Sequence, residues 1–192
     1  MKPSTPAIPH AILMIGIPGA GKSTFAERFS DTFQAPIISY TTLTKKYHVP
    51  YEAADGLIEY MIDQVAKTHR TLIIDGSANT RAQRANLAKK LQKQGYKVLT
   101  VWVQTDTNEA KRRALKKYPQ GSELTSAEFD AAVSAFQAPL SQEKPVVISG
   151  KHTYATQLKG VLRQIAAATP RTTSPPVVSP AHYPRPRGID IR

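Results

Sequence analysis

The chain has 192 residues, of which 41% are hydrophobic and 21% charged, and this length and balance predict one globular domain with a sizeable buried core. It contains no cysteine, which excludes a disulfide framework, thiolate zinc sites and cysteine catalysis. Lysine and arginine number 26 against 14 aspartate and glutamate, so the formal net charge is +12; such a surface attracts polyanions or simply keeps the protein soluble.

The first half of the chain alternates short apolar runs with segments of helical periodicity. In chain order we expect a strand at 11–15, a helix at 24–33, a strand at 36–39, a helix at 51–68 and a strand at 71–74. The helix at 51–68 has the clearest pattern, because its apolar side chains recur at 3.6-residue spacing.

The second half continues the alternation. In chain order we expect a helix at 81–94, a strand at 97–103, a basic helix at 108–117, a helix at 125–137, a strand at 146–149 and a helix at 154–168. Thr125 with Glu128 three residues later has the capping-box pattern that opens a helix. Strands alternating with helices of this length predict an α/β fold with a mainly parallel sheet covered on both faces.

Segments rich in proline flank this core. We interpret residues 1–9 as a flexible arm, 10–168 as the folded domain and 169–192 as a disordered tail, since the tail has no periodic apolar face to offset its ordering entropy. The basic end of the tail is either a peptide that docks on a protein partner or an end without a role. No apolar run reaches the roughly 18 residues of a spanning helix and no secretory signal is recognisable, so the sequence predicts a cytoplasmic protein with no membrane partner.

The strongest functional signal is the segment Gly16-Ile17-Pro18-Gly19-Ala20-Gly21-Lys22-Ser23, a complete G-x-x-x-x-G-K-[ST] pattern between a predicted strand and a predicted helix. Its glycines let successive backbone N–H groups point inward around a phosphate, and the following helix adds the positive end of its dipole. Lys22 then reaches the β- and γ-phosphates, and the Ser23 hydroxyl serves as a ligand of Mg²⁺. Residues Gly16 to Thr24 are therefore the predicted ATP-binding loop.

Asp75 follows the apolar strand at 71–74, which places its carboxylate at the sheet edge where ligands bind in open α/β folds. A carboxylate there can hold Mg²⁺ or accept a proton from an attacking hydroxyl. It could instead cap the next helix, a position that Asn79 or Thr80 could also fill.

The basic helix at 108–117 places Arg113 and Lys117 one turn apart on a shared face. Cations that close over a transferring phosphoryl group stabilise the charge of the transition state, so both are candidate catalytic residues; a solvated basic face is the alternative. The helix at 81–94 is also basic and forms either an anion-binding surface or, as is more common, a solvated face; nucleic acid is a candidate partner of the basic surface as a whole.

Together these motifs resemble the P-loop kinases of the polynucleotide kinase type, often described as AAA-type ATP-binding proteins. The resemblance runs from about Ile12 to Ala168 and rests on the phosphate loop, the strand ending in Asp75 with Asn79 soon after, and Ala110-Lys111-Arg112-Arg113. It implies a three-layer P-loop NTPase fold with a five-stranded sheet in order 2-3-1-4-5, a helical lid after the fourth strand, and ATP with Mg²⁺ as donor. In this family Asp75 matches the carboxylate that ends the third strand, and Arg113 matches a lid arginine.

Two features depart from the family pattern, the motif after the second strand and one lid position. An Asp-x-x-Arg follows the second strand in the family, and its aspartate accepts the proton of the substrate hydroxyl; here Thr41 and Thr44 replace it. Threonine can hydrogen-bond to a hydroxyl but cannot act as a general base at neutral pH. Lys117 stands where a lid arginine is common, which replaces a planar fork with a point charge.

The sequence leaves more than one function open. The first is a kinase that transfers the ATP γ-phosphate to a hydroxyl of an unidentified small molecule or nucleic acid, with Lys22, Ser23, Asp75, Arg113 and Lys117 at the site. The second is a nucleotide-binding regulator, weak ATPase or pseudokinase that acts through a partner, which the two threonines favour. Pure nucleic-acid binding has only the charge in its favour.

Overall fold

The computed structural model describes residues 8–116 and 124–168, and these form an α/β fold around one sheet. The strands are β1 (His10–Ile15), β2 (Ile37–Ser39), β3 (Leu72–Asp75), β4 (Lys97–Gln104) and β5 (Val146–Ser149). They lie in the order β2-β3-β1-β4-β5, and every neighbouring pair is parallel. The predicted fold class and strand order are therefore confirmed.

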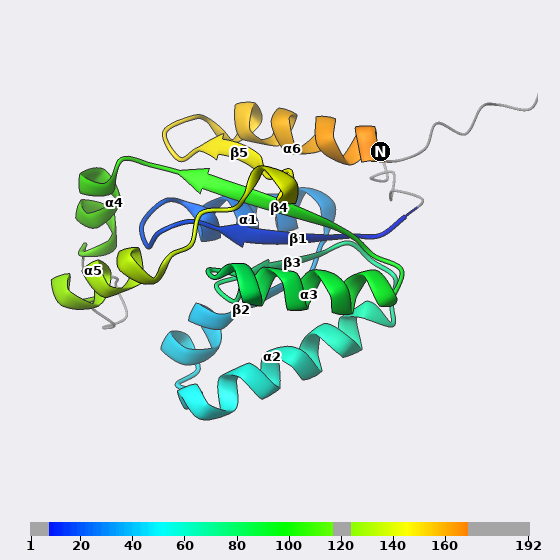
Figure 1. Ribbon diagram of the computed structural model, residues 1–192, viewed down its shortest axis with the longest axis horizontal. Helices are drawn as coiled ribbons and strands as arrows, with labels where there is room; N and C mark the ends of the chain where they lie inside the picture. Colours follow the sequence, from blue (N-terminus) through cyan, green and yellow to red (C-terminus); the bar gives the residue numbers. More distant parts are fainter. Residues whose placement is uncertain (1–7, 117–123, 169–192) are drawn as a thin grey trace, which may run out of the picture.

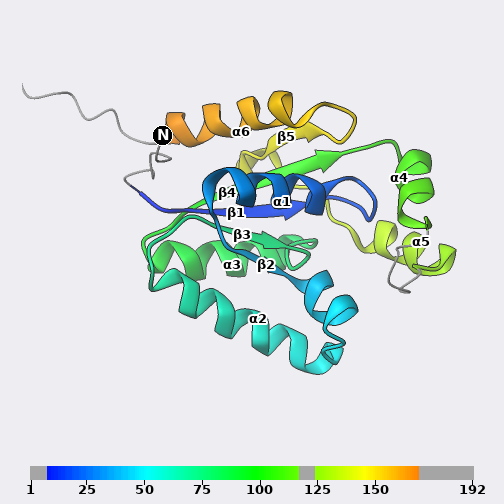
Figure 2. The same ribbon diagram turned by 180° about the vertical axis from the view of Figure 1, so that it is seen from behind.

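Helices cover both faces of the sheet. They are α1 (Lys22–Phe33), α2 (Tyr51–Ala66), α3 (Arg81–Lys93), α4 (Thr107–Ala114), α5 (Ser126–Ala135) and α6 (Tyr154–Ala168). In Figure 1, α6 lies above the sheet and α2 and α3 below it, while α4 and α5 stand beyond the strand arrowheads. Figure 2 shows α1 on the same side as α6. We call α4 and α5 the lid helices.

The central strand explains why both faces must be covered. All six residues of β1 are buried, and their side chains alternate between two hydrophobic cores. Ile12 and Met14 join the core under α1 and α6, whereas Leu13 and Ile15 join the core under α2 and α3. A strand that is apolar on both sides needs helices on both sides, which is the three-layer arrangement observed.

Capping side chains set where several helices begin. Thr80 and Thr125 cap α3 and α5 with capping boxes completed by Gln83 and Glu128, so the box predicted at Thr125 is confirmed. Asp106 caps α4 by accepting hydrogen bonds from the backbone N–H groups of Asn108 and Glu109, so this helix begins at Thr107. The helix ends at Ala114, which is shorter than the predicted range of 108–117.

A short helical turn follows β2, in a segment for which the sequence predicts no regular element. Residues Thr42–Lys46 form a short π-helical turn, η1, in which the backbone N–H of Tyr47 donates to the carbonyl of Thr42. The Thr44 hydroxyl donates to the Tyr40 carbonyl at 2.9 Å, which satisfies a backbone group inside this turn.

Parts of the sequence-based interpretation lie outside the described residues. These are residues 1–7 of the predicted arm, Lys117 in the predicted basic helix, and the predicted tail at 169–192. Within 8–116 and 124–168, none of the helices is long and apolar enough to cross a membrane.

A buried arginine joins the end of β3 to the segment before β5. Arg84 is 2% exposed and forms a two-pronged ion pair with Glu143, in which Nη2 lies 3.0 Å from Oε1. Its Nη1 also donates to the carbonyls of Ala78 and Asn79. One guanidinium therefore fixes the loop that follows Asp75.

We expect Arg84→Ala to lower the free energy of unfolding by about 3 kcal/mol, because it leaves the Glu143 carboxylate without its cationic partner and the buried Ala78 carbonyl without its donor. Urea denaturation followed by circular dichroism measures this change. Lys89→Ala on the exposed face of the same helix is the matched control, with an expected change below about 0.5 kcal/mol. Equal stabilities of the two variants would contradict this account of Arg84.

Candidate active site

The phosphate-binding loop connects β1 to α1 and packs directly against neighbouring backbone. Gly16 and Gly19 have φ values of 141° and 74°, which favour glycine. A Cβ on Gly16 would lie 2.5 Å from the carbonyl oxygen of Val103, and one on Gly19 would overlap the carbonyl oxygen of Ala110. The loop is therefore held against β4 and against the lid helix α4 at the same time.

Lys22 and Ser23 occupy the first turn of α1, at the end of the predicted loop from Gly16 to Thr24. The Lys22 ammonium donates to the carbonyls of Gly16 and Ile17 at 2.9 and 3.0 Å, so the side chain folds back over the loop. Burial lowers the pKa of Lys22, and the charge of Asp75 opposes that shift. An ammonium held over a glycine-rich loop at the start of a helix suits a bound anion.

Asp75 lies at the end of β3, 2% exposed, beside the first turn of α1. Its Oδ2 accepts a hydrogen bond from Ser23 Oγ at 2.6 Å, and its Oδ1 is buried with no partner among the described residues. Since Thr80 caps α3, the alternative role of Asp75 as a helix cap does not hold. A hydroxyl next to a carboxylate with one unused oxygen is a donor set that fits a hard cation such as Mg²⁺.

The lid arginine is tied to the phosphate-binding loop through the end of β5. Arg113 donates to the carbonyl of Gly150 at 3.1 Å and to Glu109 at 2.7 Å. Hydrogen bonds from Arg112 and then Arg113 lower the pKa of Glu109 to about 2. The sequence analysis identified Arg113 but missed Glu109. Glu109 lies four residues before Arg113 on the same helix, and this spacing is the signal that could have indicated the pair.

Gly150 completes the contact between the lid and the loop. Its N–H donates to the Gln104 carbonyl at 2.8 Å, and the neighbouring Thr105 hydroxyl donates to the Ala20 carbonyl at 2.9 Å. A Cβ on Gly150 would overlap both the Ala20 carbonyl oxygen and Thr105 Oγ1. No pattern in the sequence indicates this contact, because it joins residues 130 positions apart.

Of Thr41 and Thr44, the two residues that replace the family Asp-x-x-Arg, Thr41 is the one that lies against the loop after β3. The β2–β3 register pairs Ser39 with Asp75, so both strands end at the same level. A Cβ on Gly76 would lie 3.7 Å from Thr41 Oγ1, which places that hydroxyl next to the residue after Asp75. The Thr44 hydroxyl instead donates a hydrogen bond to the Tyr40 carbonyl.

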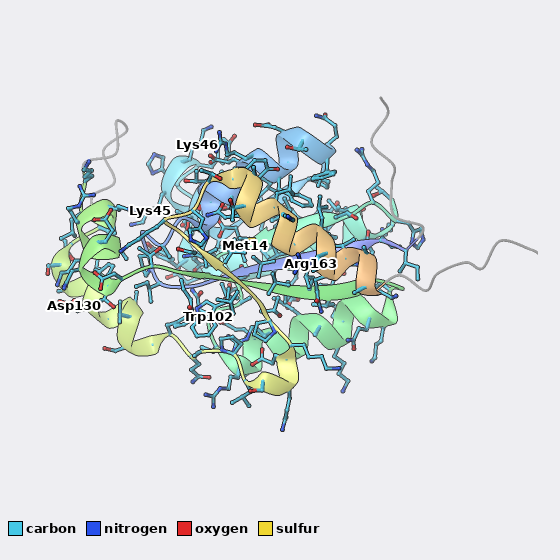
Figure 3. The ribbon with its side chains drawn as sticks, turned by 90° about the horizontal axis from the view of Figure 1, so that it is seen from above. Met14, Lys45, Lys46, Trp102, Asp130 and Arg163 are labelled. Atoms are coloured by element: carbon cyan, nitrogen blue, oxygen red, sulfur yellow. The ribbon has the colours of Figure 1, made fainter. Side chains whose placement is uncertain are left out.

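A cavity of about 840 Å³ lies on the other side of the loop, beside the ends of β4 and β5. Its lining includes Ile17, Asp106, His152 and the aromatic pair Trp102 and Phe136, whose rings are 6.3 Å apart. In Figure 3, the Trp102 label lies beside the long ribbon of β4, the strand that contains this residue. A cavity of this size, part apolar and open to a phosphate-binding loop, has the features of a small-molecule site.

A family model described as "AAA domain" matches residues 12–139. The chain belongs to this family of P-loop kinase-like proteins. A "Putative adenylate kinase" of Methanocaldococcus jannaschii is 26% identical over 105 residues, which cover 45% of this chain and 59% of that protein. The AAA domain thus spans less than two thirds of the length of this curated relative.

Solved structures share the fold of this AAA domain at low sequence identity. A gluconokinase from Sinorhizobium meliloti is 16% identical with a TM-score of 0.60, covering 84% of this chain and 94% of that chain. Kti12 from Chaetomium thermophilum, in complex with ADP-AlF3, is 16% identical with a TM-score of 0.65, covering 83% and 98%. The APS kinase CysC of Mycobacterium tuberculosis is 15% identical with a TM-score of 0.60, covering 85% and 100%. They show that the chain has a P-loop NTPase fold.

We expect Gly150→Ala to lower the free energy of unfolding of the AAA domain by roughly 2 kcal/mol, because the added Cβ would push the end of β5 off the loop. Gly160→Ala in α6 is the matched control, since its Cβ would make only an ordinary contact of 4.0 Å with Ile148. That variant should be neutral or gain about 0.5–1 kcal/mol. Chemical denaturation of both variants measures the difference, and similar values would contradict the close packing described.

Proposed function

We propose that the protein binds ATP with Mg²⁺ and transfers the γ-phosphate to an acceptor oxygen. The observation that carries this proposal is the hydrogen bond between Ser23 and Asp75 at the base of the phosphate-binding loop, with an unused carboxylate oxygen beside it. In phosphoryl transfer the protein contributes mainly positioning and charge stabilisation, and this pair lies where both are needed.

Each residue of the site has a distinct part in this proposal. Backbone N–H groups of residues 16–21 would hold the phosphates, and Lys22 would move from its two carbonyl partners to the β- and γ-phosphates. Ser23 and Asp75 would hold Mg²⁺, which supplies positive charge between the phosphates when it is bound. Arg113 would stabilise the charge that develops on the transferring group.

Known proteins of this fold support the proposal in general terms. The M. tuberculosis APS kinase was solved in complex with AMPPNP and APS, and the C. thermophilum protein with ADP-AlF3. The relatives named above include a gluconokinase and an adenylate kinase candidate, so their acceptors differ. The donor side of the reaction is therefore the part that these relatives support.

A nucleotide-dependent regulator is the second candidate function. It is favoured by Thr41 and Thr44, since neither hydroxyl is a base and that of Thr44 is bonded to the backbone. A regulator of this kind would bind ATP with little turnover and would bind a partner according to its nucleotide state. A protein partner for the tail and a nucleic-acid partner for the basic face of α3 stay predictions.

We expect the wild-type protein to bind ATP and Lys22→Ala to weaken that binding at least about tenfold, because the variant loses the cation aimed at the phosphates. Without Mg²⁺, Asp75→Asn should bind ATP about as tightly as the wild-type protein does. With Mg²⁺, the variant should lack the increase in ATP affinity that the wild-type protein shows. Isothermal titration calorimetry with and without Mg²⁺ measures both effects. Unchanged affinity in Lys22→Ala would argue against nucleotide binding at this loop.

Neighbouring arginines allow a matched test of the lid. Arg113→Met should lower the rate of γ-phosphate release or transfer by about 10²–10³, the usual loss when one transition-state cation is removed. Arg112→Met, whose side chain is 59% exposed and bonded only to Glu109, should keep most of the activity. Single-turnover assays with labelled ATP measure these rates. Equal losses in the two variants would show that α4 acts through its overall charge.

A further inference from the structure

Two adjoining cavities lie along α2 and α3. One, of about 690 Å³, is lined by residues of both helices and of the turn after α2, and the other, of about 310 Å³, by residues of α3 and its C-cap. The cavities share Lys90 and Gln94, so they form one recess, which we call the α2–α3 groove. In Figures 1 and 2 these two helices lie side by side on the face of the sheet opposite α1 and α6.

The groove lies at the opposite edge of the sheet from the phosphate-binding loop. Its lining begins at Tyr60 in α2 and at Asn86 in α3, and the chain then enters β3 at Leu72 and β4 at Lys97. The groove is therefore near the edge where these parallel strands begin, whereas the phosphate-binding loop and Asp75 are at the edge where strands end. A ligand of the groove is thus not the phosphate acceptor.

Lysines dominate the charge of the groove. Among the described residues that line it, four lysines stand against one carboxylate, that of Asp63. Lys90 pairs with Asp63 at 3.1 Å, and a hydrogen bond from Gln94 is the main cause of the lowered pKa of that carboxyl. The only acid of the lining is therefore ionised and neutralised. The remaining acidic residues of α2 do not line the groove; they are Glu52, Asp55 and Glu59.

The other lysines of the groove have no counter-ion of their own. Lys89 and Lys93 are exposed on α3, and neither forms an ion pair or a hydrogen bond with residues 8–116 or 124–168. They lie one helical turn apart, a spacing at which like charges repel each other. Lys67, at the end of α2, donates to the neutral amide of Gln64 at 3.2 Å. An anion that extends along the groove would relieve this repulsion and bind all three ammonium groups.

An exposed aromatic ring lies on the α2 wall of the same groove. Tyr60 is 61% exposed, and the amide side chains of Gln64 and Asn86 also line the recess. Proteins that bind single-stranded nucleic acid combine a cationic groove for the phosphates with aromatic side chains on which bases stack. Amides can in addition donate to and accept from the edges of bases. The groove has all three kinds of group.

We propose that the α2–α3 groove binds single-stranded nucleic acid. The phosphates of the strand lie along Lys67, Lys89 and Lys93, and one base stacks on the ring of Tyr60. A single strand fits better than a duplex, because the base faces of a duplex are covered by the neighbouring pairs. An acidic membrane would also attract the lysines, but it is flat, whereas these residues line a recess. The groove adds a function to the proposed phosphate transfer and does not depend on it.

Fluorescence anisotropy with the full chain and a labelled oligouridylate of about 12 nucleotides tests the proposal. We expect binding at low salt that weakens steeply as salt is added. Lys22→Ala should bind the strand as tightly as the wild-type protein, because Lys22 lies at the other edge of the sheet. A loss in Lys22→Ala would place the strand at the ATP site and overturn the proposal. Absence of binding, or tighter binding of a duplex, of polyglutamate or of phosphatidylserine vesicles, would also overturn it.

A matched pair of double variants locates the site. Lys89→Gln with Lys93→Gln should lower the affinity for oligouridylate about tenfold at low salt and reduce the salt slope by about 1.4, the share of two phosphate contacts. Lys159→Gln with Arg163→Gln removes the same charge at the same spacing on α6, where Figure 3 shows Arg163, and should change the affinity little. Equal losses in the two double variants would show that overall charge, not the groove, attracts the strand.

Variants of the aromatic ring test the stacking. Tyr60→Ala should lower the affinity for oligouridylate about tenfold without changing the salt slope, since stacking releases no counterions. Tyr60→Phe should keep the affinity, because it retains the ring and loses only the hydroxyl. Unchanged affinity in Tyr60→Ala, or an equal loss in both variants, would overturn the assignment of a single strand to this groove.

Discussion

Close backbone contact at three glycines is the constraint on which the rest of this site depends. Gly16 meets the end of β4, Gly19 meets α4, and Gly150 brings the end of β5 against Ala20. A side chain at any of these positions would separate the phosphate-binding loop from its neighbours by more than the packing allows. Because the loop is packed against backbone at these points, its path is fixed without help from a ligand.

The parallel sheet converts this local constraint into an arrangement of the whole site. Because all five strands are parallel, they all end at the same edge of the sheet. This edge therefore carries the loop after β1, Asp75 at the end of β3 and Gly150 just after β5. The lid arginine is attached to this edge through Gly150 rather than through the phosphate-binding loop itself. Because Gly150 also packs against Ala20, a shift of β5 relative to the phosphate-binding loop would move Arg113 as well.

The sequence predicted the parts of the structure that depend on local pattern. The strand periodicity, the capping box at Thr125 and the phosphate-binding motif are all encoded within a few residues, and the structure has each of them. The strand order could be inferred only from the family resemblance, because pairing of β1 with β3 and β4 is non-local. The Arg84–Glu143 ion pair and the Gly150 contact join residues far apart in sequence, so no local signal predicts them.

The site also shows why a motif alone does not define a reaction. Sequence pattern places threonine at positions 41 and 44, and by itself this favours loss of activity. The structure separates the two, since the Thr44 hydroxyl is bonded to the Tyr40 carbonyl while Thr41 lies beside Gly76, the residue after Asp75. A base is needed only when the nucleophile arrives protonated. Residue 41 therefore bears only on the acceptor step of the proposed reaction, whereas the contacts of Lys22 with the phosphate-binding loop and of Ser23 with Asp75 do not depend on it.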